Sequence, residues 1–411
     1  MKISILTLGC KANQAESLDM ESHLRSAGYS IVDLSQNPDL CIINTCTVTA
    51  KSDYQSRQLI RRAARAGSKV IVTGCYSEIK KDEVNAIEGV FKVVPNEEKD
   101  FIIKELIQNI STNTLNYSSG RSRFFLKIQD GCNYSCSYCV IPRARGRSRS
   151  LIPEVIIDRI REITPYFREV VLTGIHLGTY GYDLKPKLKL SDLIELILKE
   201  TSIRRIRISS LDIKEIDDHM IDLLSDNRIC KHLHIPLQSG DDRILKFMKR
   251  NYKINDFLKV LYKIIRNHPD ISIGTDIIVG FPGEGEREFN NTKEIVMTLP
   301  FSYLHVFPYS SRSGTEASLM RPLKGEDIKK QRAAIIRELG IQKRLNYMRD
   351  QVGKTLDVLI EKRVGKEYIG LSSNYLRVKT ISENLSLREI VNVRVSEVLE
   401  KEVFGHVVRN L

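Results

Sequence analysis

Cys132-Asn-Tyr-Ser-Cys136-Ser-Tyr-Cys139 follows a predicted strand at 124–129 and is the most informative stretch of the chain. Three thiolates in a Cys-x3-Cys-x2-Cys pattern can hold three irons of a cubane iron–sulfur cluster and leave the fourth iron open. A structural zinc site needs four ligands, and no Cys or His follows Cys139 at the spacing of a zinc knuckle. The stretch therefore predicts a reactive iron–sulfur centre, since an open iron can chelate a small molecule.

Six predicted strands alternate with amphipathic helical segments in the middle of the chain. They are expected at 124–129, 169–173, 205–209, 232–237, 273–279 and 304–307. This alternation predicts a six-unit (β/α) partial barrel, and the active site of such a barrel lies at the carboxyl ends of its strands. The three-cysteine stretch occupies that position after the first strand.

The first hundred or so residues also alternate strand and helix, with strands expected at 2–8, 39–44, 70–73 and 90–94. The alternation predicts an α/β domain with a parallel sheet. Cys10, Cys46 and Cys75 each follow one of these strands, and loops at the carboxyl ends of parallel strands converge on one crevice. The sequence thus predicts a second cluster site, whereas Cys41 and Cys230 fit small buried core residues.

Changes in composition along the chain predict three domains. A Ser-, Asn- and Thr-rich connector at 111–120 is expected to join an N-terminal domain, 1–110, to a barrel domain, 121–349, which ends in a basic helix. Residues 350–411 contain strands without a long helix between them, which predicts a small antiparallel β-barrel.

The formal charge of +13 over 411 residues favours a polyanionic partner, because Lys and Arg release counterions when they neutralise phosphates. Charge alone does not separate a nucleic-acid-binding protein from an ordinary basic one. The eight cysteines occur without a signal peptide, and no apolar run approaches the length of a membrane span. These features predict a cytoplasmic protein, in which cysteines serve as metal ligands more often than as disulfides.

The segment from Gly131 to Arg147, GCNYSCSYCVIPRARGR, resembles the signature of radical S-adenosylmethionine enzymes and, within them, of the methylthiotransferases. The resemblance covers nearly the whole chain and extends to the C-terminal part, which resembles a TRAM domain, a small RNA-binding barrel. It implies one [4Fe-4S] cluster on the Cys132, Cys136 and Cys139 thiolates and a second on Cys10, Cys46 and Cys75, with S-adenosylmethionine as the other cofactor. The implied partners are a tRNA anticodon stem-loop and a flavodoxin- or ferredoxin-like electron donor. We expect a monomer.

The family's chemistry, as the resemblance implies it, uses two molecules of S-adenosylmethionine. One methylates a sulfur carried on the auxiliary cluster, and the other is cleaved to a 5′-deoxyadenosyl radical. The radical removes hydrogen from carbon 2 of an adenine, to which the methylthio group is transferred. Acid–base catalysis by side chains cannot activate such a C–H bond, so a radical source is required.

Within the family, Thr7-Leu-Gly-Cys10-Lys-Ala-Asn-Gln14 resembles the branch that acts on N6-threonylcarbamoyladenosine at position 37 of tRNA. Lys11 is the discriminating residue. The branch acting on isopentenyl-adenosine usually has Gln there, and the branch acting on an aspartate of a small-subunit ribosomal protein has Pro. Both branches stay open as alternatives, as does a non-catalytic iron–sulfur RNA-binding protein that senses redox state.

Several other residues receive roles from their places in these motifs. Contacts to S-adenosylmethionine are expected from Tyr138, Gly174, Gln238, Ser239 and Gly280. A threonylcarbamoyl group carries a carboxylate, so Lys11 is expected to bind it, with Arg143 or Arg145 as alternates. Plain structural roles are the alternatives: packing for Tyr138, a turn for Gly174 and a solvated loop for Lys11. Tyr375 or Phe404 is expected to stack on an RNA base.

Overall fold

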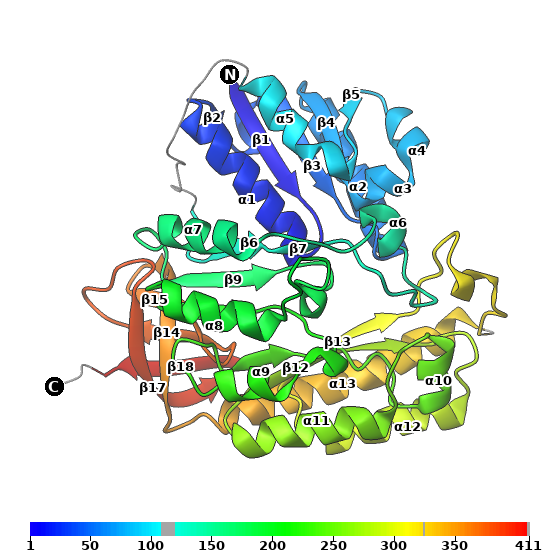
Figure 1. The fold of residues 1–411 in the computed structure, drawn as a ribbon, viewed down its shortest axis with the longest axis vertical. Helices are drawn as coiled ribbons and strands as arrows, with labels where there is room; N and C mark the ends of the chain where they lie inside the picture. The colour runs from blue at the N-terminus through cyan, green and yellow to red at the C-terminus, as the bar shows by residue number, and fades with distance from the viewer. Residues whose placement is uncertain (108–119, 324, 409–411) are drawn as a thin grey trace.

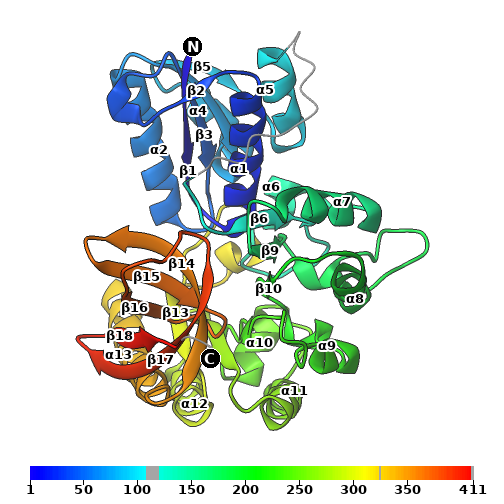
Figure 2. The ribbon, with the colours of Figure 1, turned by 90° about the vertical axis from the view of Figure 1, so that its left-hand side faces the viewer.

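The computed structural model describes residues 1–107, 120–323 and 325–408. Figures 1 and 2 show the N-terminal sheet at the top, the partial barrel below it and the C-terminal barrel packed beside the partial barrel. Apart from Gly120, the predicted linker at 111–120 lies outside the described residues. No helix within the described ranges is long and apolar enough to cross a membrane.

The N-terminal unit is a five-stranded parallel sheet of order β2-β1-β3-β4-β5. Its strands are β1 (Lys2–Thr7), β2 (Ser30–Ile31), β3 (Leu40–Thr45), β4 (Lys69–Gly74) and β5 (Val90–Val93). Its helices are α1 (Lys11–Ser26), α2 (Ala50–Arg65), α3 (Cys75–Ile79), α4 (Lys81–Asn85) and α5 (Lys99–Leu106). Every residue of β3 is buried, as expected for a central strand with helices on both faces. The predicted α/β fold is confirmed here, with β2 as a short edge strand that was not predicted.

The middle of the chain forms the predicted six-stranded partial barrel. Its parallel strands are β6 (Phe124–Lys127), β9 (Glu169–Thr173), β10 (Arg205–Ile208), β11 (His232–His234), β12 (Ser272–Val279) and β13 (Tyr303–Pro308). A bridge between Ser210 and His234 joins the two three-stranded halves. The longer helices that cover it are α7 (Pro153–Ile163), α8 (Leu190–Glu200), α11 (Ile254–Asn267), α12 (Glu286–Thr298) and α13 (Glu326–Arg349). The shorter helices α9 (Asp218–Leu223) and α10 (Asp242–Phe247) complete the cover.

Alternate residues of the barrel strands lie in two different environments, one apolar and one polar. Leu172, Ile206 and Ile208 belong to the large apolar core under the helices. Glu169 and Arg207 are equally buried but polar, and they do not belong to that core. Because side chains alternate along a strand, one face of the sheet packs the helices while the other presents charged and polar groups.

The C-terminal unit is a closed five-stranded barrel. Its strands β14 (Thr355–Val364), β15 (Glu367–Ser372), β16 (Arg377–Ile381), β17 (Ile390–Leu399) and β18 (Glu402–Val407) pair in the order β14-β15-β16-β18-β17. The pairing is antiparallel, as predicted, except between β16 and β18. Closure leaves no exposed sheet edge.

The C-terminal barrel docks onto the polar face of the partial barrel. Arg205 donates to the carbonyl oxygen of Leu371 at 3.0 Å, and Arg207 donates to that of Ser372 at 3.0 Å. Glu169 lies between the two guanidinium groups and pairs with both. The contact between the two barrels is therefore buried, and it consists of hydrogen bonds from two guanidinium groups that Glu169 holds in place.

Tyr375 extends this contact into the partial barrel. Its ring stacks on His232 with centroids 4.3 Å apart, and the Arg207 guanidinium lies 5.4 Å from the ring centroid. The rings on which Tyr375 packs are thus side chains of the partial barrel, and stacking of Tyr375 or Phe404 on an RNA base stays a prediction. Only the fold brings His232 and Tyr375 together, because they are far apart in the sequence.

Candidate active site

The first cysteine triad lies in the loop between β7 (Gln129–Asp130) and α6 (Ile141–Arg145). Ser137 anchors this loop, since its backbone N–H donates to the Met248 carbonyl at 3.1 Å and its hydroxyl donates to the Phe247 carbonyl at 2.6 Å. The loop lines a cavity of about 820 Å³, and the cavity wall includes all three cysteines, Cys132, Cys136 and Cys139. The structure thus places the triad at the open end of the partial barrel.

Two cationic groups face the sulfurs of this triad. His176 Nδ1 lies 3.3 Å from Cys132 Sγ, and its Nε2 lies 2.6 Å from a Glu215 carboxylate oxygen. Burial disfavours the charged imidazole, but the hydrogen bonds to Cys132 and Glu215 outweigh it and raise the pKa of His176 to about 10. Arg250 donates to Cys136 Sγ at 3.5 Å. The sequence analysis missed His176 and Arg250, although His176 lies two residues after the predicted Gly174.

The second triad assembles where β1, β3 and β4 end. Cys10 begins α1 as its N-cap, Cys46 directly follows β3, and Cys75 begins α3. A Cβ built on Gly9 would lie 2.9 Å from Cys46 Sγ, so the backbone beside Cys10 lies directly against Cys46. The three thiols are close enough for their charges to interact. The predicted convergence of these cysteines at one edge of the sheet is what the structure shows.

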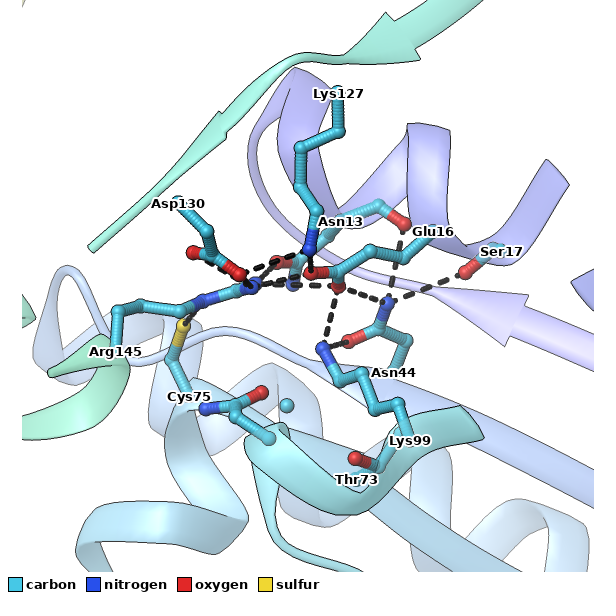
Figure 3. A network of polar contacts seen from close by, with 12 residues as sticks. Asn13, Glu16, Ser17, Asn44, Thr73, Cys75, Lys99, Lys127, Asp130 and Arg145 are labelled. Atoms are coloured by element: carbon cyan, nitrogen blue, oxygen red, sulfur yellow. Dashed lines mark hydrogen bonds and ion pairs between the residues drawn. The ribbon is translucent and has the colours of Figure 1, made fainter. Parts of the chain in front are cut away.

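A buried polar network surrounds this second triad (Figure 3). Asn13 donates to the carbonyl oxygens of Leu8 at 2.8 Å and of Thr45 at 2.9 Å, which are the residues just before the loops of Cys10 and Cys46. Asn44 donates to the Asn13 carbonyl at 3.1 Å and to Glu16 at 3.2 Å. The network thus fixes the backbone on which the triad stands.

The charges of this network do not balance within the protein. Glu16 pairs with Lys99, Lys127 and Arg145, and Asp130 pairs with Lys127 and Arg145. Three cations therefore share two carboxylates in a largely buried place, which favours an additional anion nearby. Arg145 Nε donates to Cys75 Sγ at 3.1 Å. A thiolate-bound iron–sulfur cluster supplies an anion at that sulfur, so the residues present fit such a group.

Burial raises the pKa of the Cys46 thiol to about 11 and that of the Cys139 thiol to about 12. Both groups are therefore neutral thiols near pH 7 unless a metal displaces the proton. The eight cysteines, all of which lie within the described residues, are free of disulfides.

Comparison with known proteins agrees with this geometry. Residues 126–296 match the Radical SAM superfamily, and residues 2–95 match the group described as Uncharacterized protein family UPF0004. The chain is 38% identical to the threonylcarbamoyladenosine tRNA methylthiotransferase MtaB of Aquifex aeolicus, over 92% of this chain and 96% of that protein. The chain belongs to the radical S-adenosylmethionine methylthiotransferase family. Membership implies a [4Fe-4S] cluster and S-adenosylmethionine.

Other relatives span similar shares of the chain. The MtaB protein of Bacillus subtilis is 36% identical over 96% of this chain and 93% of its own length. The tRNA-2-methylthio-N(6)-dimethylallyladenosine synthase of Clostridium botulinum is 30% identical over 95% of this chain and 93% of its own length. Among solved structures, the radical S-adenosylmethionine methyltransferase TsrM of Kitasatospora setae has a TM-score of 0.55 at 14% identity, covering 77% of each chain. That likeness shows the shared fold.

In this methylthiotransferase, the structure shows which protein groups surround each residue that is predicted to contact S-adenosylmethionine. Tyr138 packs edge-on against Phe281 with ring centroids 6.3 Å apart. Gly174 lies so close to Gln129 that an added Cβ would be 2.7 Å from its amide oxygen. Gly174 directly follows β9 and Tyr138 lies in the loop of the first triad beside Cys139, as predicted, and their contacts to the cofactor stay a prediction.

The remaining predicted cofactor residues follow β11 and β12. Gln238 adopts a left-handed backbone with φ of 64°, and its N–H donates to the Asp276 carbonyl at 2.8 Å. Ser239 is fully buried, with its hydroxyl 3.4 Å from that of Thr292. The Gly280 N–H donates to a Glu284 carboxylate oxygen at 2.8 Å. Ser239 is thus held inside the protein, whereas the role of Gln238 and Gly280 at the cofactor stays a prediction.

The three predicted substrate cations lie in different environments. Arg143 borders the cavity of the first triad and donates to the Ser313 carbonyl at 2.9 Å. Arg145 is buried in the network of the second triad, so it has no free face for a substrate. The Lys11 ammonium lies 5.9 Å from the centre of the Tyr375 ring. Within the described residues, no carboxylate lies within ion-pair distance of Lys11.

Proposed function

We propose that this enzyme inserts a methylthio group at carbon 2 of N6-threonylcarbamoyladenosine at position 37 of tRNA. The reaction would use two molecules of S-adenosylmethionine and two [4Fe-4S] clusters. The partners would be the anticodon stem-loop and a flavodoxin- or ferredoxin-like electron donor, for a monomer in the cytoplasm. The names of the Aquifex and Bacillus relatives support the substrate, and the net charge of +13 suits an RNA partner.

The main support for this substrate comes from the charged groups around Lys11. Burial, with repulsion from Arg207 and Arg123, lowers the pKa of Lys11 to about 8, so the ammonium is still mostly charged near pH 7. Glu169, the carboxylate whose charge favours the ammonium, is already held by Arg205 and Arg207. A half-buried cation with other cations near it attracts an anionic ligand. The threonylcarbamoyl group carries such an anion, and an isopentenyl group does not.

Each cysteine triad has a distinct task in this proposal. Cys132, Cys136 and Cys139 would hold the cluster that, with S-adenosylmethionine, supplies the radical chemistry. Cys10, Cys46 and Cys75 would hold the auxiliary cluster. His176 and Arg250 lie against sulfurs of the first triad and would stabilise the negative charge of its thiolates.

Alanine substitution of each triad tests these tasks. The triple variant Cys132→Ala, Cys136→Ala, Cys139→Ala should retain about half of the iron and lose S-adenosylmethionine cleavage, because one of two clusters is removed. The corresponding variant of Cys10, Cys46 and Cys75 should retain cleavage but form no methylthio product. The variant Cys41→Ala, Cys230→Ala is the matched control, since both cysteines are buried in the core. Full iron content in the second triple variant would show that the auxiliary site is misassigned.

The substrate is tested with threonylcarbamoyl and isopentenyl forms of tRNA offered in parallel, followed by nucleoside mass spectrometry. Product should appear only on the threonylcarbamoyl form. Lys11→Gln should lower kcat/KM by about 10- to 100-fold, since a charge-assisted hydrogen bond contributes about 1.5–3 kcal/mol. Lys51→Gln, at an exposed lysine of α2, should leave the rate and the iron content unchanged. Equal turnover of the isopentenyl form would refute the substrate, and so would modification of a ribosomal protein aspartate instead.

A further inference from the structure

Arg145 connects the two cysteine triads. It is the last residue of α6, which directly follows the loop of Cys132, Cys136 and Cys139. Its side chain is 1% exposed, and its Nε donates to Cys75 Sγ at 3.1 Å (Figure 3). A residue that is close to the first triad in the sequence therefore contacts a sulfur of the second triad.

The rest of the guanidinium is also fully engaged. Nη1 donates to Glu16 and lies 3.3 Å from an Asp130 oxygen. Nη2 donates to Asn13 Oδ1 and, at 3.3 Å, to Glu16. A guanidinium offers five N–H donors in a fixed plane, and this site provides acceptors on each of its three nitrogens. Lysine carries the same charge but cannot reproduce this fork.

Asn13 connects Arg145 through hydrogen bonds to the backbone near the other two cysteines. The Asn13 amide nitrogen donates to carbonyl oxygens just before the loops of Cys10 and Cys46, while its oxygen accepts from Arg145. One guanidinium is thus bonded to Cys75 directly and, through one side chain, to the backbone that carries Cys10 and Cys46. The neighbouring Arg149 is half-exposed; it donates to the Arg147 carbonyl at 3.4 Å and lies 3.5 and 4.0 Å from the carboxylates of Glu97 and Asp130.

We propose that Arg145 is a positioning residue that fixes the loop of the first triad against the auxiliary cluster and raises the reduction potential of that cluster. The inference rests on the auxiliary cluster of the proposed function. An N–H donor and a positive charge beside a cluster sulfur stabilise the more negative, reduced state. Arg145 provides both to the Cys75 sulfur in a place that excludes water.

The test uses the Cys132→Ala, Cys136→Ala, Cys139→Ala background, in which any remaining cluster is the auxiliary one. The potential is measured by redox titration followed by electron paramagnetic resonance, with no tRNA present. Arg145→Met should make reduction at least tenfold less favourable, a shift of about 59 mV to lower potential for one electron. Arg145→Lys should give an intermediate value, because it restores the charge without the fork. Arg149→Met, at a half-exposed arginine of the same segment, should leave the potential unchanged.

A second variant distinguishes an effect on the cluster from a loss of protein stability. It is needed because Arg145→Met removes one of the three cations that pair with the buried Glu16 carboxylate. In Glu16→Gln, Arg145→Met the Glu16 carboxylate is removed together with its arginine, while Asp130 keeps its ion pair with Lys127, and the lower potential should persist. Loss of iron in Arg145→Met that Arg145→Lys restores would also support a positioning role. Equal potential and iron content in Arg145→Met and Arg149→Met would overturn the inference while leaving the proposed function intact. Absence of iron from the background variant itself would overturn both.

Discussion

Replacing Glu169 with Gln should destabilise the protein strongly, because this carboxylate holds the C-terminal barrel against the partial barrel. Glu169 begins β9 and is fully buried. It accepts from Arg205 Nε at 2.9 Å and from Arg207 Nε at 2.8 Å. Glutamine keeps the size of the side chain but removes the carboxylate that pairs with both buried guanidinium groups, and Arg205 keeps only its ion pair with Asp357.

The size of the effect follows from the pKa of Glu169. Burial raises this pKa, but Arg207 and Arg205 outweigh burial and lower it from 4.5 to about 2. A shift of roughly 2.5 units corresponds to about 3 kcal/mol, which agrees with the roughly 3–5 kcal/mol expected for breaking a buried ion pair. Because the folded-state pKa is the lower one, this stabilisation is present above pH 4.5 and is lost as the pH falls toward 2.

Thermal unfolding of the iron-free protein at pH 7 measures this contribution. For a domain of 150–250 residues, about 3 kcal/mol lowers Tm by about 6–12 °C. Glu200→Gln is the control, since Glu200 forms a partly exposed ion pair with Arg161 and should change Tm by about 2 °C or less. The difference between the native protein and Glu169→Gln should also shrink as the pH is lowered from 4.5. A Tm for Glu169→Gln equal to that of the control would refute the reasoning.

Two further predictions concern the auxiliary site and the C-terminal barrel. Gly74→Ala should cost more than the roughly 1–3 kcal/mol of backbone strain alone, because φ is 104° and the new Cβ would lie 2.3 Å from a backbone nitrogen of β3. It should also reduce iron content by displacing Cys75, whereas Gly67→Ala, with positive φ but open space around it, should keep its iron. Deleting the chain from Asp350 should weaken tRNA binding and flatten its salt dependence, as measured by filter binding at several salt concentrations. Unchanged affinity and slope would contradict an RNA-binding role for the C-terminal barrel.

The sequence predicts the parts of this fold that local patterns encode. The alternation of strand and helix locates the barrel strands closely, and the rule that parallel strands end at one edge brings Cys10, Cys46 and Cys75 together. The two-residue strand β2 is too short to leave a periodic pattern. The partners of Arg145 and Tyr375 could not be predicted for another reason: a charged or aromatic residue outside a strand or helix pattern carries no sign of its long-range partner.

The insertion of Tyr375 into the partial barrel limits how freely the C-terminal barrel could be exchanged between relatives. The ring contacts His232 and lies near the Lys11 ammonium, so the C-terminal barrel supplies part of the wall around a predicted substrate residue. A chimera that receives a foreign C-terminal barrel would need an aromatic ring at this position and carbonyl groups placed to receive Arg205 and Arg207. We therefore expect that exchanging the C-terminal barrel changes the surroundings of Lys11 as well, although Lys11 belongs to the N-terminal domain.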